Sequence, residues 1–235
     1  MRQSESTRIG ILSFLSFSRI RSFFLLLQGR SNQRSNNHKD AIRDFTTAIR
    51  IDPGNPKAYY ARGVAKVSLG DFESAVVDFT KAIRYQPHNV DAYYSRGNAY
   101  FQLCDYAKAQ KDLEKALQLK PGLVDALSMS GSAKFYLNDL LGALHDYTAA
   151  IRKDPDDPIL YYNRGNTRLK MDDARGALQD FNIAIQFDPY YKEAYISRGN
   201  AKMALGSETG ASVDWARADK IRQGNITPDI TPTAG

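Results

Sequence analysis

Apolar residues in this chain recur in pairs of stretches, each about thirteen residues long, with a short polar break between the two. Within a stretch the apolar residues follow one another at intervals of three and four, the spacing of one face of an α-helix. Between residues 90 and 123 the pattern predicts a first helix over about 90–102 and a second over about 106–118. Two helices joined by so short a break form an αα-hairpin, so the chain is predicted to be all-α.

This hairpin pattern repeats with a strict period of 34 residues. Proline cannot donate a helical hydrogen bond and disfavours helical backbone in the residue before it, so it is expected to close each second helix. It recurs at Pro53, Pro87, Pro121, Pro155 and Pro189. The resulting frames are 56–89, 90–123, 124–157 and 158–191, with partial-looking copies at 22–55 and 192–225. About six copies of one unit predict an elongated array.

Residue size is also repeated at fixed positions of each copy. In the copy 90–123, Gly97 and Ala109 lack bulk where two helices must approach each other, and Leu113 fills space between them. The recurring glycines are Gly29, Gly63, Gly97, Gly131, Gly165 and Gly199. The alanines are Ala41, Ala75, Ala109, Ala143, Ala177 and Ala211, and then Ala48, Ala82, Ala116, Ala150, Ala184 and Ala218. The large residues between the alanines are Phe45, Phe79, Leu113, Tyr147, Phe181 and Trp215.

Over roughly residues 22–222 these positions resemble the tetratricopeptide repeat (TPR). The resemblance implies a right-handed α-solenoid of stacked antiparallel hairpins, in which the first helix of each hairpin lines the concave side. One hairpin cannot bury its own apolar face, so stacking on neighbouring hairpins must supply the stability. The expected organisation is a basic segment 1–22, a TPR array 23–222 and a disordered tail 223–235.

The net charge of +6 is concentrated at the start of the chain. Residues 1–40 hold seven Lys/Arg and two Asp/Glu, which leaves 25 basic and 24 acidic residues for 41–235. A nearly neutral array argues against a phosphate-binding surface, so no nucleic-acid partner is expected. The segment 1–22 is rich in Ser and Arg, and its apolar run 9–17 is too short for a transmembrane helix. An ordinary extension of a cytoplasmic protein is the favoured interpretation of this segment, and an export or organelle-import signal is the alternative.

No catalytic or metal-binding constellation stands out. Cys104 is the only cysteine, so no intrachain disulfide is possible, and a half-buried packing role is expected for it. The three histidines occupy unrelated positions of different copies. The acidic cluster 154–157 lacks the spacing and the glycine of a calcium loop. The sequence therefore predicts no enzyme activity and no cofactor.

A charged pair also recurs. Aspartate occurs at Asp44, Asp78, Asp112, Asp146, Asp180 and Asp214, and arginine at Arg62, Arg96, Arg164 and Arg198, with Ser130 in the fourth copy. We expect each arginine to pair with an aspartate of an adjacent helix and to fix the stacking register. The contribution of such a pair is about 0–1 kcal/mol if it is exposed.

Positions 2, 5, 9 and 12 of each copy lie on one stripe of the first helix, which the resemblance places in the groove. Tyrosines there supply apolar area with a polar tip, and asparagines can donate to and accept from a peptide backbone. The candidate peptide-binding residues are Tyr60, Tyr94, Asn98, Phe101, Ser128, Ser132, Phe135, Tyr162, Asn166 and Asn200. The predicted function is a scaffold that binds a protein or peptide segment in this groove. Alternatively, the asparagines bond neighbouring helices and the tyrosines cover the core.

Three further expectations concern particular copies. In the fourth copy Ser128, Ser130 and Ser132 replace bulky or charged residues, through sequence drift or to open a central pocket. In the first copy the polar run Asn32–Lys39 predicts a frayed first helix. No polar helix follows the last copy in this sequence, which leaves an apolar end. That end supports the alternative function, a structural spacer or self-assembly module.

Overall fold

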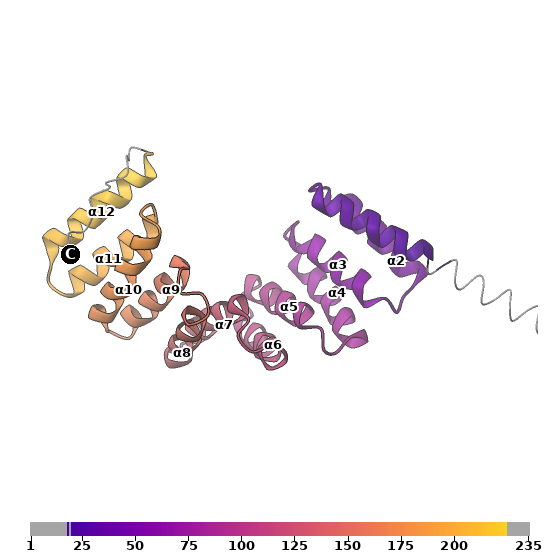
Figure 1. The fold of residues 1–235 in the computed structure, drawn as a ribbon, viewed down its shortest axis with the longest axis horizontal. Coiled ribbons are helices and arrows are strands. Elements are labelled where there is room, and N and C mark those ends of the chain that lie inside the picture. The colour runs from indigo at the N-terminus through magenta and orange to yellow at the C-terminus, as the bar shows by residue number, and fades with distance from the viewer. Residues whose placement is uncertain (1–17, 19, 225–235) are drawn as a thin grey trace, which may run out of the picture. The chain divides into compact units, whose positions relative to one another are not determined.

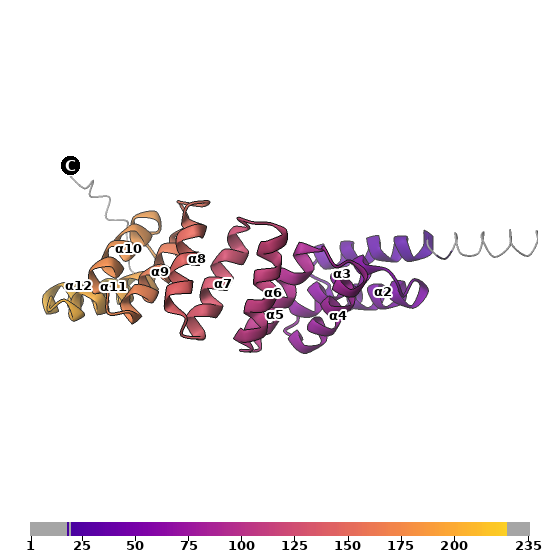
Figure 2. The same ribbon diagram turned by 90° about the horizontal axis from the view of Figure 1, so that it is seen from below.

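A computed structural model describes residue 18 and residues 20–224 of the chain, and every regular element in them is helical. Residues 1–17 and 19 of the predicted segment 1–22, and residues 225–235 of the predicted tail, lie outside the described residues. The chain divides into two compact units, Met1–Pro121 and Gly122–Gly235. The helices of each unit are antiparallel pairs (Figure 1), which the view in Figure 2 shows from a second side.

The first unit contains three hairpins. Residues 20–34 are helical and precede α2 (His38–Ile51). The next two hairpins are α3 (Pro56–Val67) with α4 (Phe72–Tyr85), and α5 (Val90–Gln102) with α6 (Tyr106–Leu119). The helices predicted over 90–102 and 106–118 are confirmed by α5 and α6.

The second unit repeats this arrangement. Its hairpins are α7 (Val124–Tyr136) with α8 (Leu140–Ile151), α9 (Pro158–Lys170) with α10 (Ala174–Phe187), and α11 (Lys192–Ala204) with α12 (Glu208–Arg222). In both units the second helix of one hairpin packs on the first helix of the next. The all-α fold of stacked hairpins is thereby confirmed, whereas its right-handedness stays an expectation.

Within each unit the first helices lie closer together than the second helices do. Helix α3 contacts α5, α7 contacts α9, and α9 contacts α11. Among the labelled helices of either unit, no second helix makes such a contact with another second helix. Because the hairpins converge on the side of their first helices, these helices form the inner face of each unit.

Short turns with one left-handed residue join the two helices of each hairpin. Residues 34 apart adopt a positive φ there: Asn36, Gly70, Cys104, Asn138, Asp172 and Gly206. Cys104, with φ of 58°, is exposed and holds this turn position, so the expected half-buried packing role is wrong. The turn chemistry overrides its apolar character. The following aspartates cap four of the second helices by accepting a bond from a backbone N–H three residues on, as Asp105 does from Lys108 at 3.2 Å.

The first hairpin is better ordered than its polar sequence predicts. Residues 32–34 remain helical and residues 35–37 form the turn before α2, so the expected fraying over Asn32–Lys39 is wrong. The Nδ2 of Asn32 donates to the carboxylate of Asp44 at 2.8 Å. The buried hydroxyl of Ser22 donates to the carbonyl of Ala48 at 3.1 Å, which ties the helix start to α2.

The two helices of a hairpin meet at the repeated glycine. A Cβ added to Gly63 would lie 2.7 Å from the ring of Phe79, and one added to Gly165 would lie 2.7 Å from the ring of Phe181. Such distances leave no room for a methyl group. The buried alanines then let the next hairpin approach, as Ala82 does against Ala92. The predicted role of the small residues is confirmed.

Each recurring aspartate from Asp78 onward is almost completely buried and neutralised by a cation of its own hairpin. The guanidinium of Arg96 donates twice to Asp112, at 2.6 and 2.7 Å, and once to Thr80 Oγ1 of the preceding hairpin at 2.9 Å. In the other copies with arginine, Arg62, Arg164 and Arg198 make the same two kinds of contact. The arginine therefore joins the two helices of its hairpin to the hairpin before it, as the register hypothesis requires.

We expect Asp112→Ala to lower the free energy of unfolding by about 3 kcal/mol, because it leaves the half-buried guanidinium of Arg96 without its partner. Glu114→Ala is the matched control on the same helix, since Glu114 is exposed and its change should cost less than about 0.5 kcal/mol. Urea unfolding followed by circular dichroism measures both.

The pairing itself is tested by two double-mutant cycles. The cycle of Arg96→Ala with Asp112→Ala should show coupling, whereas the cycle with Asp78→Ala should not, because Asp78 pairs with Arg62 and Lys66. Equal effects of Asp112→Ala and Glu114→Ala would contradict the assignment.

Candidate functional site

The stripe of positions 2, 5, 9 and 12 lies on the inner helices of both units. Most of its members are half-buried. In the last hairpin the equivalent residues Ile196, Asn200 and Met203 are exposed. The stripe thus provides one candidate binding face on α3 and α5 and another on α7, α9 and α11.

The stripe tyrosines contribute to packing as well as to the inner face. The ring of Tyr60 lies 5.8 Å from that of Phe79, and its hydroxyl is 3.5 Å from Ser95 Oγ on the next first helix. The ring of Tyr162 lies 6.2 Å from Phe181 and 4.9 Å from Tyr191. These contacts agree with the alternative that the tyrosines cover the core. Each of the two side chains is only half-buried, so its exposed part is available to a ligand.

The stripe asparagines are not used to join helices. Among the described residues, Asn98 bonds within α5, where its Oδ1 accepts from Gln102 Nε2 at 3.5 Å. In the described part of the chain, neither Asn166 nor Asn200 bonds to a neighbouring helix. Their amide groups therefore retain the capacity to pair with a peptide backbone.

The serines of the fourth copy satisfy buried polar groups. Ser130 is fully buried and its hydroxyl donates to Asp146 at 2.6 Å, beside Lys134 Nζ at 2.7 Å from the same carboxylate. Ser130 takes the place of the missing arginine, and Lys134 pairs with the aspartate as Lys66, Arg168 and Lys202 do in other copies. The Oγ of Ser132 lies 2.9 Å from the hydroxyl of Tyr147, a position that holds phenylalanine in three other copies. Burial raises the pKa of Tyr147 to about 12, so its hydroxyl stays protonated and needs a partner.

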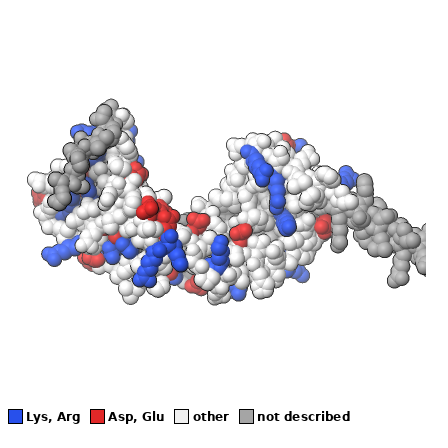
Figure 3. Space-filling view, viewed as in Figure 1, with Lys and Arg blue, Asp and Glu red and all other residues white. Residues whose placement is uncertain are grey.

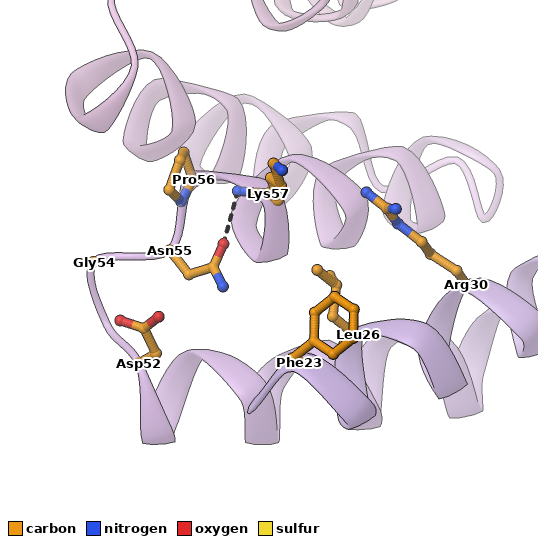
Figure 4. Close-up of a pocket in the computed structure, with 8 residues that line it drawn as sticks. All are labelled: Phe23, Leu26, Arg30, Asp52, Gly54, Asn55, Pro56 and Lys57. Carbon is orange, nitrogen blue, oxygen red and sulfur yellow. Dashed lines mark hydrogen bonds between the residues drawn. The ribbon is translucent and has the colours of Figure 1, made fainter. Parts of the chain in front are cut away.

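A cleft of about 520 Å³ opens on the inner side of the first unit (Figure 4). Phe23, Leu26 and Arg30 project into it from the helix of residues 20–34. Asp52, Gly54, Asn55, Pro56 and Lys57 line its other wall, at the turn into α3. Phe23 is 56% exposed, whereas Leu26 is buried and forms part of the core. An apolar floor with polar groups above it suits one apolar side chain of an extended segment.

Sequence reasoning missed this cleft because the first copy looked degraded. Phe23, Leu26 and Arg30 occupy positions 2, 5 and 9 of that copy, the same stripe that gave the predicted site residues. Applying the offsets to residues 22–55 would have found them. The predicted residues themselves divide between the units: Tyr60, Tyr94, Asn98 and Phe101 lie in the first, and Ser128, Ser132, Phe135, Tyr162, Asn166 and Asn200 in the second.

Charge is mixed around these faces. Arg30 and Lys57 flank the cleft together with the carboxylate of Asp52. On the face shown in Figure 3, basic and acidic side chains are interspersed among uncharged residues in both units. Among the residues that the structure describes, no group of His, Cys, Asp and Glu is arranged to hold a metal ion. None of the described helices is long and apolar enough to span a bilayer.

Comparison of the sequence with family models gave three matches. Two models described as tetratricopeptide repeat match residues 26–66 and 90–123, and one described as TPR repeat matches residues 65–103 and 131–172. The search of curated proteins found no match.

Solved structures with a similar fold include MamA (residues 41 to the end) from Desulfovibrio magneticus RS-1, with 21% identity and a TM-score of 0.70 over 73% of this chain and 97% of that one. YrrB, described as a TPR protein with an unusual peptide-binding site, has 23% identity and a TM-score of 0.65, and the match covers 76% of this chain and 92% of YrrB. PilF of Pseudomonas aeruginosa has 15% identity and a TM-score of 0.73 over 88% of this chain and 94% of PilF. At these identities the likeness concerns the fold.

The role of Ser132 can be measured through stability. Ser132→Ala should lower the free energy of unfolding by about 1–3 kcal/mol, because it leaves the buried hydroxyl of Tyr147 unpaired. Adding Tyr147→Phe should recover most of that loss, since Phe79 and Phe181 fill the same position in other copies. Thermal unfolding of the two variants compares them directly, and a double variant no more stable than Ser132→Ala would contradict this role.

Proposed function

We propose, from the premise that the chain belongs to the tetratricopeptide repeat family, that its inner helices bind an extended segment of a partner protein. The role proposed is a non-catalytic scaffold. The observation that carries the proposal is the cleft of about 520 Å³ on the inner side of the first unit, with its apolar floor and polar rim. The fold likeness to YrrB, a TPR protein with a peptide-binding site, supports the same class of function.

Binding would combine two kinds of contact. Apolar side chains of the segment would rest on Phe23 and the exposed edges of Tyr60, while the segment's backbone would pair with asparagine amides such as that of Asn98. In the second unit, Asn166 and Asn200 would serve the same purpose. Because residues 41–235 hold 25 basic and 24 acidic residues, long-range electrostatic steering should be weak.

A ligand needs to contact only one of the two units. Each unit has its own inner face, and each face carries at least one asparagine of the stripe. A segment bound along a single face is sufficient for the proposal. A partner with two such segments would gain affinity by engaging both units.

The test is selection from a displayed library of random peptides, followed by titration of the selected peptides. The groove variant is Asn98→Ala/Asn166→Ala/Asn200→Ala. The variant should bind each peptide with about fivefold lower affinity, because it loses one hydrogen bond to the peptide backbone, worth about 1 kcal/mol. Circular dichroism establishes that the variant remains folded.

The matched control is Val77→Ser/Leu141→Ser, which removes apolar side chains that are 59% and 71% exposed on the second helices α4 and α8. Its affinity for the selected peptides should equal that of the wild type. Peptides that bind the groove variant normally but lose affinity for the control would place binding on the outer face and refute the proposal.

A further inference from the structure

Each hairpin that follows another within a unit buries two positions of its first helix against the hairpin before it, and α3 buries a third position between them. In α3 these are Ala58, Ala61 and Ala65, which pack against Phe45 and Ala48 of α2. All three alanines are at most 5% exposed. The contact is the unit of stacking in this chain, because one hairpin cannot cover its own apolar face.

The equivalent positions of the first hairpin are open. Counting back 34 residues from the three alanines gives Phe24, Leu27 and Ser31. Phe24 is 63% and Leu27 is 43% exposed, and Ile20 on the same side of the helix is 51% exposed. We name Ile20, Phe24 and Leu27 the leading face. Large apolar side chains stand here where α3 buries alanine.

The last described hairpin has the complementary surface. In α9 and α10, Tyr162, Phe181 and Ala184 pack toward the following hairpin, against Ala194 and Ala201. The residues 34 positions later are Ile196, Trp215 and Ala218. We name these three the trailing face. Ile196 is 40% exposed, and Met203 beside it on α11 is 43% exposed.

A cavity of about 330 Å³ marks the centre of the trailing face. It is lined by Lys192, Ile196, Trp215, Ala218, Asp219 and Arg222. One hairpin earlier, Ala184 and Ile185 hold the positions of Ala218 and Asp219, and they enclose Ala194, the third residue of the next copy. The cavity thus lies where the third residue of a following copy would sit. In the first copy that residue is Phe24.

We propose that a second copy of this chain docks its leading face on the trailing face, with Phe24 seated in the cavity. The new contact continues the stacking that already joins hairpins within each unit, and one chain supplies both halves of it. The phenyl ring of Phe24 is larger than the alanine side chain at the equivalent position of the last copy, Ala194, and would fill the cavity. Because the two faces differ, the contact is head-to-tail, and repetition gives an open chain or a closed ring.

The inference goes beyond the proposed function and does not depend on it. Ile196 belongs both to the inner stripe and to the trailing face, whereas Phe24 lies outside the stripe, so the Phe24→Asp variant separates the two proposals. Its test is the mass of the full chain by light scattering over a wide range of concentrations. We expect the wild-type mass to rise with concentration. Phe24→Asp and Ile196→Asp should each weaken assembly by about tenfold or more, because each would bury an unpaired carboxylate.

Mixing the two variants gives the sharper result. Phe24→Asp retains an intact trailing face and Ile196→Asp an intact leading face, so an equimolar mixture should form a complex of one copy of each and stop there. Val77→Asp is the control, because Val77 is 59% exposed on α4, away from both faces, and it should assemble as the wild type does. Circular dichroism verifies the fold of all three.

Two outcomes would overturn the proposal. A wild-type mass that stays at one copy at every concentration would show that the two faces do not bind each other. Normal assembly of Ile196→Asp together with loss of assembly in Phe24→Asp would show that two leading faces pair symmetrically.

Discussion

The close approach of two helices at a glycine is the contact on which the rest of the structure depends. At Gly63 and Gly165 the absence of a side chain makes room for a phenyl ring of the second helix. The ring lies so close that a methyl group on the glycine would overlap with it. The ring fixes the spacing of the pair, and the alanines around it present a smooth surface to the next hairpin. Since the same contact recurs every 34 residues, the hairpins stack in one register.

The buried charges reinforce that register. Arg96 reaches both Asp112 of its own hairpin and Thr80 of the preceding one, so a shift between the two hairpins would break the bond to Thr80. With the interior held in this way, the inner stripe is free to vary. Across the copies the stripe carries tyrosine, asparagine, serine, isoleucine and methionine. Substitutions at these positions can change which ligand is bound without disturbing the fold.

Much of the fold follows from the sequence because its determinants are local and repeated. The period, the prolines and the glycine–ring pairs predict the helices, and α5 and α6 confirm the predicted ranges closely. The site is harder, because the stripe positions are half-buried and serve packing and recognition together. The roles of Ser130 and Ser132 were missed, since each depends on a buried partner, Asp146 or Tyr147, that only the packed structure reveals. The cleft at Phe23 was missed because it lies in a copy whose sequence looked degraded.

The most direct test of this account concerns the glycine contact. Gly165→Ala should lower the free energy of unfolding by about 1–3 kcal/mol through overpacking against Phe181, although alanine is the better helix former. Phe181→Leu should relieve that clash, because the third copy combines Gly97 with Leu113, where an added Cβ would find its nearest side-chain atom at 3.0 Å. Urea unfolding of both single variants and the double variant is the measurement. We predict that the double variant loses clearly less stability than the sum of the losses in the two single variants. Strictly additive losses, or a Gly165→Ala variant more stable than the wild type, would contradict the account.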